Sequence, residues 1–452
     1  MSAGLSVGVD TSSAADAGGV SDSTPTATSP PTNHDRKSLH LWLEITVNDP
    51  EKRNANMKES YVVYCIETRV IDSNMPKYGD APTSCWRRYS EFELLRNYLI
   101  SFYPNLIIPP LPYKKAPQFI GRSSIPLSLY NRTESDFIEK RRIGLEKFLM
   151  RIAKHKILSM DKIFFCFLFE DSAIWRDRLA ACDCKSKTDF KALTSIMMAI
   201  KKKKGSSLNG NEQLHKEKIY SDNVISCINT LIKIRGRILN SENIVHRYHG
   251  DYGKVMIEWW AVEDGFGGLQ AASHYLDAFS QNVEPFMDEE DVLMESLHDC
   301  LRYVHSLRKV CLREEMMLLN SEELEASLRN KESQKNLVQQ QQQERQMEGV
   351  GVKNSLMKNM KERIFGCESN EEREAHLKCI EHDIHISKEM FHALQRDTKN
   401  ACETATEDIR RFHAEKNSDI SHILLRMAFV QIEKSKKNVT VWQNIKESFH
   451  KL

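Results

Sequence analysis

The chain has 452 residues, which is enough for two or three domains. Its 64 Lys and Arg nearly balance 63 Asp and Glu, and the net charge of +1 excludes the overall basic character expected of a nucleic-acid-binding protein. Eleven cysteines without framework spacing indicate a reducing compartment, and no apolar run is long enough to cross a bilayer. With no apparent signal peptide, we expect a cytosolic protein whose membrane contact is peripheral.

The first 37 residues are predicted to be a disordered tail. Residues 1–37 are rich in Ser, Thr, Ala, Gly and Pro, so they cannot bury enough apolar surface to offset the entropy of ordering. We expect no fold in this segment.

Residues 38–171 are predicted to form a compact α+β module that begins with a three-stranded meander. Apolar and polar residues alternate from Leu39 to Val47, and this period of two predicts a strand that Asn48-Asp49-Pro50 ends. Residues 61–71 are rich in β-branched and aromatic side chains and predict a second strand. Residues 84–88 predict a third, which ends at two adjacent arginines.

Apolar spacings of three and four predict the helices of this module. The first follows Ser90, a candidate N-cap with Glu93 three residues later, and ends at Tyr103-Pro104. A second spans 135–154, and a third spans 162–169. The inner face of the second is marked by Phe137, Arg141, Gly144, Leu145, Phe148 and Ile152. Residues 109–112 favour polyproline II, which we interpret as an ordered loop rather than an SH3 ligand.

Basic residues cluster at three separate places in the module. They are Arg87-Arg88 at a strand end, Lys114-Lys115 after the prolines, and Lys140-Arg141-Arg142 on the second helix. Arginine forks match phosphate oxygens, and a ring such as that of Tyr89 can lie against a sugar-like ring. Three basic sites that converge in one fold predict an anion pocket. Because side chains alternate along a strand, Arg87 should face away from Arg88 and be structural.

This order of elements and motifs closely resembles the PX (phox homology) domain over residues 38–171. The resemblance rests on Arg-Arg-Tyr-Ser-Glu-Phe, on Pro-Pro-Leu-Pro followed by lysine, and on Arg-Arg-Ile-Gly-Leu-Glu. It implies that Arg88 binds the 3-phosphate of phosphatidylinositol 3-phosphate, with Tyr89 stacked on the inositol ring and Ser90 beside the same phosphate. It also implies that Lys114 binds the 1-phosphate and that Arg142 binds the 4- and 5-hydroxyls.

Further candidates for membrane contact lie outside this pocket. Phe119 and Ile120 follow the prolines and either dip into the bilayer or pack within their own loop. Residues 172–212 are predicted to be a basic amphipathic linker with Phe190 on its apolar stripe. The lysines that follow this stripe are Lys201, Lys202, Lys203 and Lys204. The linker helix either inserts into a membrane or docks on the next domain.

Residues 213–452 contain one proline and are rich in helix formers, which predicts an all-α domain of three long antiparallel helices. The predicted spans are 212–263, 269–348 with a kink at Pro285, and 370 to the C-terminus. Their apolar surface exceeds what one chain can cover, which predicts a dimeric coiled coil. The tip between the last two helices is either solvated or contacts phospholipid through Lys353, Lys358 and Lys361.

The long helices are similar to a BAR domain, and a PX domain followed by a BAR domain is the arrangement of the sorting nexin family. Two runs, 248–255 and 441–447, add to the likeness. It implies a protein on the cytosolic face of early endosomes that binds phosphatidylinositol 3-phosphate and senses or induces curvature. The implied roles are tubule-based cargo recycling and autophagy-related traffic. The implied assembly is a homodimer, or a heterodimer with another sorting nexin.

Motifs for catalysis are missing from the sequence. We find no Gly-rich phosphate loop, no Gly-x-Ser-x-Gly and no His-Glu-x-x-His. His382 and His385 could share a metal, but we interpret them as a pair on a helix surface. We therefore expect no enzyme, no cofactor and no metal site. The alternative function is a coiled-coil scaffold that tethers cytoskeletal or signalling partners to endosomes.

Overall fold

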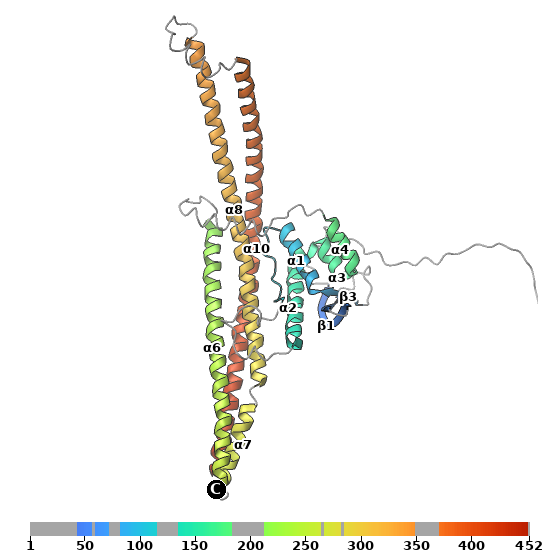
Figure 1. Cartoon of the computed structure of the whole chain (residues 1–452), viewed down its shortest axis with the longest axis vertical. Helices are drawn as coiled ribbons and strands as arrows, with labels where there is room; N and C mark the ends of the chain where they lie inside the picture. Colours follow the sequence, from blue (N-terminus) through green and yellow to red (C-terminus); the bar gives the residue numbers. More distant parts are fainter. Residues whose placement is uncertain are drawn as a thin grey trace, which may run out of the picture.

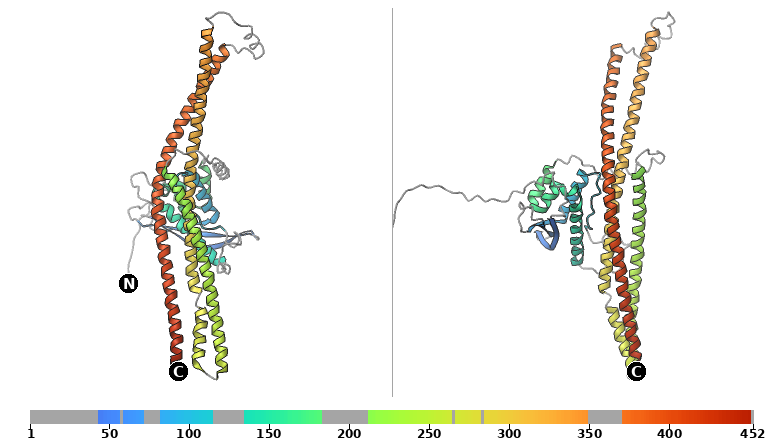
Figure 2. Two further views of the ribbon diagram at one scale, coloured as in Figure 1. Left: turned by 90° about the vertical axis from the view of Figure 1, so that its left-hand side faces the viewer. Right: turned by 180° about the vertical axis from the view of Figure 1, so that it is seen from behind.

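The computed structural model describes two units that lie side by side (Figure 1). The first, here called the sheet module, is residues 43–182, and the second, the helical unit, is residues 212–450. The described residues are 43–56, 59–71, 82–114, 134–182, 212–263, 266–281, 284–348 and 370–450. The predicted tail and residues 183–211 of the predicted linker lie outside them. Two further views show the sheet module against the flank of the much longer helical unit (Figure 2).

The sheet is the three-stranded antiparallel meander that the sequence predicts. Its strands, in spatial order, are β1 Leu43–Asn56, β2 Glu59–Val70 and β3 Thr83–Arg88. The alternating apolar residues Leu43, Ile45 and Val47 are buried in the core of the module. Burying such a face removes apolar area from water, which holds the helices against the sheet.

The prediction that Asn48-Asp49-Pro50 ends the first strand was wrong. The pairing of β1 with β2 shifts register between Asn48 and Glu51, and Asp49 has a φ of 21°. A bulge leaves an extra residue out of the ladder, so a proline without an N–H is tolerated there and the strand continues. β1 therefore runs nine residues beyond Val47, to Asn56.

The described part of the sheet module also contains four helices and a short 3-10 turn. They are α1 Tyr89–Phe102, α2 Glu134–Lys154, η5 Leu158–Met160, α3 Lys162–Phe169 and α4 Ser172–Ala181. The predicted N-cap of α1 was misplaced, because Arg88 takes that position and its N–H donates to Glu91 Oε2 at 2.8 Å. α4 lies within the predicted linker, yet its Trp175 is fully buried in the core of the sheet module.

The helical unit contains the long antiparallel helices, with one interruption. The described elements are α6 Glu212–Val262, α7 Gly267–Gln281, α8 Glu284–Glu348 and α10 Asn370–His450. The predicted second helix is thus divided into α7 and α8, and Pro285 lies in the first turn of α8, where its missing N–H is not needed. Both α6 and α10 pack against α7 and α8. At 1.5 Å per residue, α10 is about 120 Å long.

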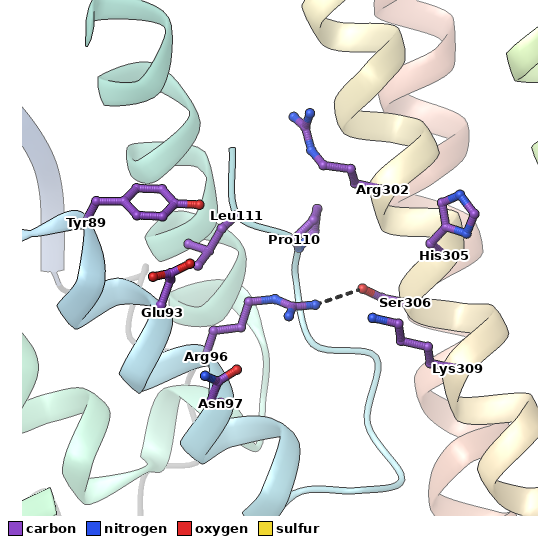
Figure 3. A pocket seen from close by; sticks show the side chains of 10 residues that line it. All are labelled: Tyr89, Glu93, Arg96, Asn97, Pro110, Leu111, Arg302, His305, Ser306 and Lys309. Atoms are coloured by element: carbon purple, nitrogen blue, oxygen red, sulfur yellow. Dashed lines mark hydrogen bonds between the residues drawn. The ribbon is translucent and has the colours of Figure 1, made fainter. Parts of the chain in front are cut away.

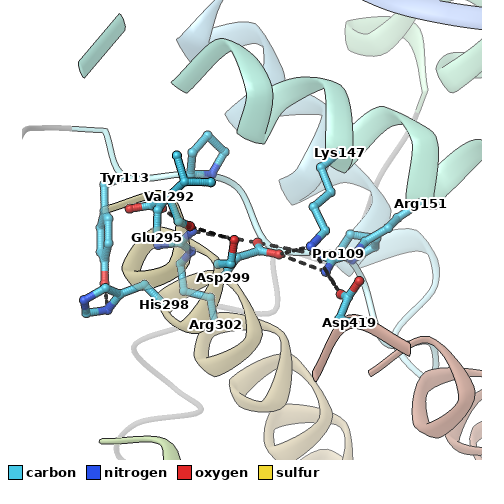
Figure 4. A network of polar contacts seen from close by, with 12 residues as sticks. Pro109, Tyr113, Lys147, Arg151, Val292, Glu295, His298, Asp299, Arg302 and Asp419 are labelled. Atoms are coloured by element: carbon cyan, nitrogen blue, oxygen red, sulfur yellow. Dashed lines mark hydrogen bonds and ion pairs between the residues drawn. The ribbon is translucent and has the colours of Figure 1, made fainter. Parts of the chain in front are cut away.

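A polar seam joins the two units. Arg151 of α2 donates to Asp419 at 2.6 Å and to Asp299 at 2.9 Å, and Lys147 lies 3.0 Å from Asp299 (Figure 4). The Arg151 guanidinium also lies over the Tyr303 ring, 4.4 Å from its centroid. The charges of Arg151 and Lys147 hold the pKa of Asp299 below its usual range, although burial alone would raise it.

Asp408 of α10 is a second buried carboxylate in this seam, with 4% of its surface exposed. Its Oδ2 accepts the N–H of Ile107 at 2.6 Å, and its Oδ1 lies 2.9 Å from His155 Nε2 and 2.6 Å from Arg411 Nε. Ile107 comes from the loop after α1, yet its side chain belongs to the core of the helical unit. Burial would raise the pKa of Asp408, but the hydrogen bond with His155 and the Arg411 charge lower it.

Replacing Asp408 by Asn should loosen the seam. We expect a loss of about 3 kcal/mol of unfolding free energy, because the variant leaves His155, Arg411 and the Ile107 N–H without their buried carboxylate. Urea unfolding followed by tryptophan fluorescence measures the loss. Glu407→Gln is the matched control, since Glu407 is an exposed neighbour that pairs with Arg410 on the surface. The control should change stability by less than about 0.5 kcal/mol.

The difference between wild type and Asp408→Asn should also depend on pH. Because the folded-state pKa of Asp408 is lowered, its contribution is present above the unfolded-state value of about 3.9 and is lost as pH falls through the folded-state value. The two proteins should therefore converge in stability below about pH 4. A gap that stays constant or widens towards acid would contradict the assigned role.

Candidate functional site

The two arginines at the end of β3 have separate environments, as alternation along the strand predicts. Arg87 is fully buried, and its guanidinium donates to the carbonyl oxygens of Phe167, at 2.9 and 3.1 Å, and of Glu170. Arg88 is partly exposed, and its guanidinium carbon lies 3.4 Å from the centroid of the Tyr61 ring. Arg87 is therefore structural, whereas Arg88 is available to an anion.

The N-terminus of α1 adds its own positive end to the site. Arg88 is the N-cap, Tyr89 is the first helical residue, and Ser90 follows with an exposed side chain. The first N–H groups of a helix have no partner within it and carry a partial positive charge, which suits a phosphate oxygen. Ser90 thus lies next to Arg88 at this helix end, which is the place that the resemblance implies for it.

Tyr89 is held by the proline loop, residues 103–114. Its hydroxyl donates to the Pro112 carbonyl at 2.7 Å, and burial together with the charge of Glu93 raises its pKa to about 12. The phenol is therefore neutral at physiological pH and its ring has a fixed place. The loop packs closely on α2, since a Cβ added to Gly144 would lie 2.7 Å from Pro112 Cβ. A residue larger than glycine at this position of α2 would displace the loop.

The loop itself is ordered, as predicted, and Lys114 ends its described part. Pro109 and Pro110 are buried, and the Pro109 carbonyl accepts from Arg96 at 2.9 Å. The Lys114 ammonium is mostly exposed and lies 2.6 Å from the Glu93 carboxylate of α1. A surface ion pair of this kind contributes little to stability, so Lys114 can exchange Glu93 for another anion at small cost.

Arg141, rather than Arg142, is the α2 arginine that contacts Tyr89. The Arg141 guanidinium lies 5.1 Å from the Tyr89 centroid and donates to Tyr64 Oη at 3.3 Å and to the Lys114 carbonyl at 2.6 Å. Its carbon also lies 4.4 Å from the centroid of the Phe137 ring. Four groups are thereby gathered at the N-terminus of α1, and they are Arg88, Tyr89, Lys114 and Arg141.

Arg142 points to β1 instead. Its guanidinium donates to the Val47 carbonyl, lies 2.7 Å from Glu139 and 3.4 Å from Glu146, and is largely buried. The hydrogen bond with Glu139 raises its pKa. These carboxylates already neutralise its charge. The α2 arginine that lies beside Tyr89 is therefore Arg141, which the apolar spacing of the helix had placed on the inner face.

The predicted membrane contacts fall on residues that the structure does not describe. They are Phe119, Ile120, Phe190, Lys201, Lys202, Lys203, Lys204, Lys353, Lys358 and Lys361. Among the described helices, none is both long and apolar enough to cross a membrane. Within the same residues, no cluster of three or more His, Cys, Asp or Glu side chains is placed to hold a metal ion.

The helical unit exposes two apolar stripes. Large side chains with about half or more of their surface exposed recur at spacings of three, four and seven on α6 and α10. The stripe on α6 comprises Tyr248, Tyr252, Val255 and Trp259, and the stripe on α10 comprises Leu425, Phe429, Ile432 and Val439. A shallow hollow on α10 is lined by Ile432 and Val439. Contiguous exposed apolar surface of this kind marks an interaction face.

Comparison with known proteins matches the chain over nearly its full length. The PX domain family matches residues 75–171. Sorting nexin-4 from Bos taurus is 36% identical over 417 residues, which cover 91% of this chain and 87% of that protein. Sorting nexin-4 from Homo sapiens is 36% identical over 423 residues, and covers 91% and 89%. Among solved structures, the cryo-EM structure of the SNX-BAR Mvp1 tetramer has 18% identity and a TM-score of 0.47, and covers 89% of this chain and 99% of that chain.

Substitution of the two arginines by methionine should separate structure from binding. Arg87→Met should lower the unfolding free energy by about 3 kcal/mol, because it removes the guanidinium donors of the buried carbonyls of Phe167 and Glu170. Arg88→Met, one residue along, should change it by less than about 1 kcal/mol, since that side chain is partly exposed. Urea unfolding of both variants measures the difference. Equal losses would show that the burial of Arg87 carries no structural role.

Proposed function

This chain belongs to the sorting nexin family, and we propose that its sheet module binds phosphatidylinositol 3-phosphate on early endosomes. The family relation makes it a phosphoinositide-binding protein of membrane traffic that associates with endosomal membranes peripherally. The observation that carries the finer proposal is the gathering of Arg88, Tyr89, Lys114 and Arg141 around the N-terminus of α1.

Each group has a distinct role in the proposed complex. Arg88 and the free N–H groups beside Ser90 bind the 3-phosphate, because a guanidinium fork and a helix N-terminus both match phosphate oxygens. The face of the Tyr89 ring packs against the inositol ring. The Lys114 ammonium leaves Glu93 and binds the 1-phosphate, which connects the headgroup to its lipid.

Arg141 supplies the selectivity in this proposal. It lies over Tyr89 and already donates to two neutral oxygens, so its remaining donors can meet the 4- and 5-hydroxyls. A phosphate at either position would replace the hydroxyl and crowd the ring against α2. Each charge-assisted hydrogen bond contributes about 1.5–3 kcal/mol, and one such pocket is expected to give roughly micromolar binding.

We further propose that the chain acts as a dimer through the apolar stripes of α6 and α10. Pairing would cover the exposed side chains of both stripes and place two lipid pockets on one particle. The second pocket then binds at a high effective concentration, so a weak headgroup site becomes a firm membrane attachment. The partner is a second copy or another sorting nexin. The elongated shape of the helical unit supports recognition of a curved membrane (Figure 2).

The proposed role is the sorting of cargo into tubules that leave early endosomes for recycling, with a part in autophagy-related traffic. The proposed pocket binds a 3-phosphorylated lipid, and the elongated helical dimer favours a curved membrane. Together they would direct the protein to membranes that have both features.

Three single variants test the pocket by vesicle sedimentation. Arg88→Gln and Arg141→Gln should each weaken binding to phosphatidylinositol 3-phosphate vesicles by roughly tenfold or more, because each removes charge-assisted hydrogen bonds. Arg142→Gln, on the adjacent residue, should stay within roughly twofold, because its guanidinium is already neutralised by Glu139 and Glu146. Vesicles of phosphatidylcholine alone provide the background.

The opposite order would refute the assignment of Arg141. If Arg142→Gln abolished binding while Arg141→Gln bound normally, the ligand would lie on the β1 side of α2. Circular dichroism of each variant confirms that the comparison is between folded proteins.

Charge placed in the α10 stripe should break the dimer. Phe429→Glu should convert the species seen by sedimentation velocity from twice the chain mass to the mass of one chain, because an unpaired carboxylate would be buried at the interface. Lys399→Glu is the matched control on the exposed polar surface of the same helix and should leave the mass unchanged. Phe429→Glu should also weaken vesicle binding, since the avidity of two pockets is lost. A dimer that tolerates this change would place the interface elsewhere.

A further inference from the structure

A second polar cavity lies in the seam between α1, the proline loop and α8 (Figure 3). Its volume is about 310 Å³, which is within the range of small-molecule sites. The residues that matter for its chemistry are Glu93 and Arg96 of α1 and Arg302, His305, Ser306 and Lys309 of α8. On α8 these four recur at spacings of three and four, so they share one face of the helix. The cavity therefore exists only where the two units meet.

The charge of this cavity is strongly positive. Arg96, Arg302 and Lys309 line it, whereas burial and the charges of Arg308 and Lys309 lower the pKa of His305 and favour its neutral form. Among the described lining residues the one acid is Glu93, and its carboxylate pairs with Lys114 at 2.6 Å. The cavity thus has an excess of donors and positive charge, which is the reverse of the acid-rich contact that Asp299 and Asp419 make elsewhere in the seam.

Arg96 lies at the centre of this cluster and has neutral acceptors. Its Nε donates to the Pro109 carbonyl at 2.9 Å, and its Nη2 donates to Ser306 Oγ at 3.4 Å. Figure 3 shows the Lys309 amine directed towards the same guanidinium. Partial burial and the charges of Arg96 and Arg313 lower the pKa of Lys309. A bound anion would relieve this repulsion and bridge α1 to α8.

Arg302 gives independent evidence that the cavity accommodates an anion. Its Nη2 donates to Glu295 at 2.9 Å, and its guanidinium lies 4.4 Å from the centroid of the Tyr113 ring. Its Nε and Nη1 are buried and have no hydrogen-bond partner among the described residues. Buried donors without acceptors are costly, so their presence beside a polar cavity points to a ligand with acceptor oxygens.

We propose that this cavity is a second anion site, which takes a phosphate-bearing ligand the size of a phosphorylated inositol ring. Several phosphate oxygens suit a site with arginine forks, an ammonium and the Ser306 hydroxyl. The ligand is either a soluble inositol polyphosphate or the headgroup of a multiply phosphorylated lipid. By bridging Arg96 to Lys309 it locks the sheet module onto α8. Tyr89 lines this cavity as well, so the two proposed sites adjoin.

Titration of the full-length chain with inositol hexakisphosphate tests this site. Isothermal titration calorimetry should show binding that Lys309→Gln weakens by roughly tenfold, and the double variant Arg96→Gln/Lys309→Gln by more, because charge-assisted contacts are removed. Lys233→Gln, an exposed lysine on α6, is the matched control and should bind as wild type. The ligand should also raise the Tm of wild type and leave that of the double variant unchanged. Because Lys309 is more exposed than Arg96, its single variant keeps the test valid if the double variant does not fold.

Arg88→Gln separates the two sites. It should bind inositol hexakisphosphate as wild type does, even though it loses phosphatidylinositol 3-phosphate vesicles. Loss of the soluble ligand in Arg88→Gln, or full retention in Lys309→Gln, would overturn the proposal. In the Arg88→Gln background, vesicles with phosphatidylinositol 4,5-bisphosphate distinguish the sources. Vesicle binding that depends on Lys309 assigns a lipid headgroup, and calorimetric binding without vesicle binding assigns a soluble ligand.

Discussion

The buried carboxylate of Asp408 fixes how the two units of this protein are joined. It belongs to α10, yet it accepts the N–H of Ile107 and contacts His155, which follows α2. Burying a carboxylate costs free energy unless hydrogen-bond donors surround it. The two units therefore pack in the one orientation that brings these donors to Asp408. The side chain of Ile107 is buried in the core of the helical unit. This apolar burial stabilises the contact between the two units, but the hydrophobic effect is not directional and does not fix their orientation. The hydrogen bonds of Asp408 are directional, and they fix the orientation of the sheet module relative to the helical unit.

The same loop also fixes the geometry of the proposed lipid pocket. Ile107 anchors the chain in the helical unit, and five residues later Pro112 accepts the Tyr89 hydroxyl, followed by the Lys114 carbonyl, which accepts from Arg141. The loop thus links the proposed headgroup site to the seam through contacts of one short segment. Displacing it at Gly144 or at Asp408 would disturb the pocket and the orientation of the helical unit together.

The sequence predicts the elements well and their long-range contacts poorly. Apolar residues with a period of two locate β1–β3, and apolar residues with a period of about 3.6 locate the long helices. The predicted span of α3, residues 162–169, matches the observed helix. The same spacing placed Arg141 on the inner face of α2, whereas transfer from the family motif chose Arg142. Adjacent residues on a helix point about 100° apart, so that shift moves a side chain from the pocket to β1. The bulge at Asp49 and the burial of Trp175 depend on tertiary packing. Ile107 and Asp408 are 301 residues apart, and no local pattern relates them.

Charge is distributed unevenly along the seam, and this follows from which side chains face each other. Lys147 and Arg151 of α2 meet Asp299 and Asp419, so that end is neutralised by partners within the chain. At the α1 end, Arg96 and Lys309 face each other across the cavity while Glu93 turns to Lys114. A nearly neutral chain can therefore contain a locally cationic site. The fold holds these positive groups together because Asp408 and the α2 contacts close the rest of the seam.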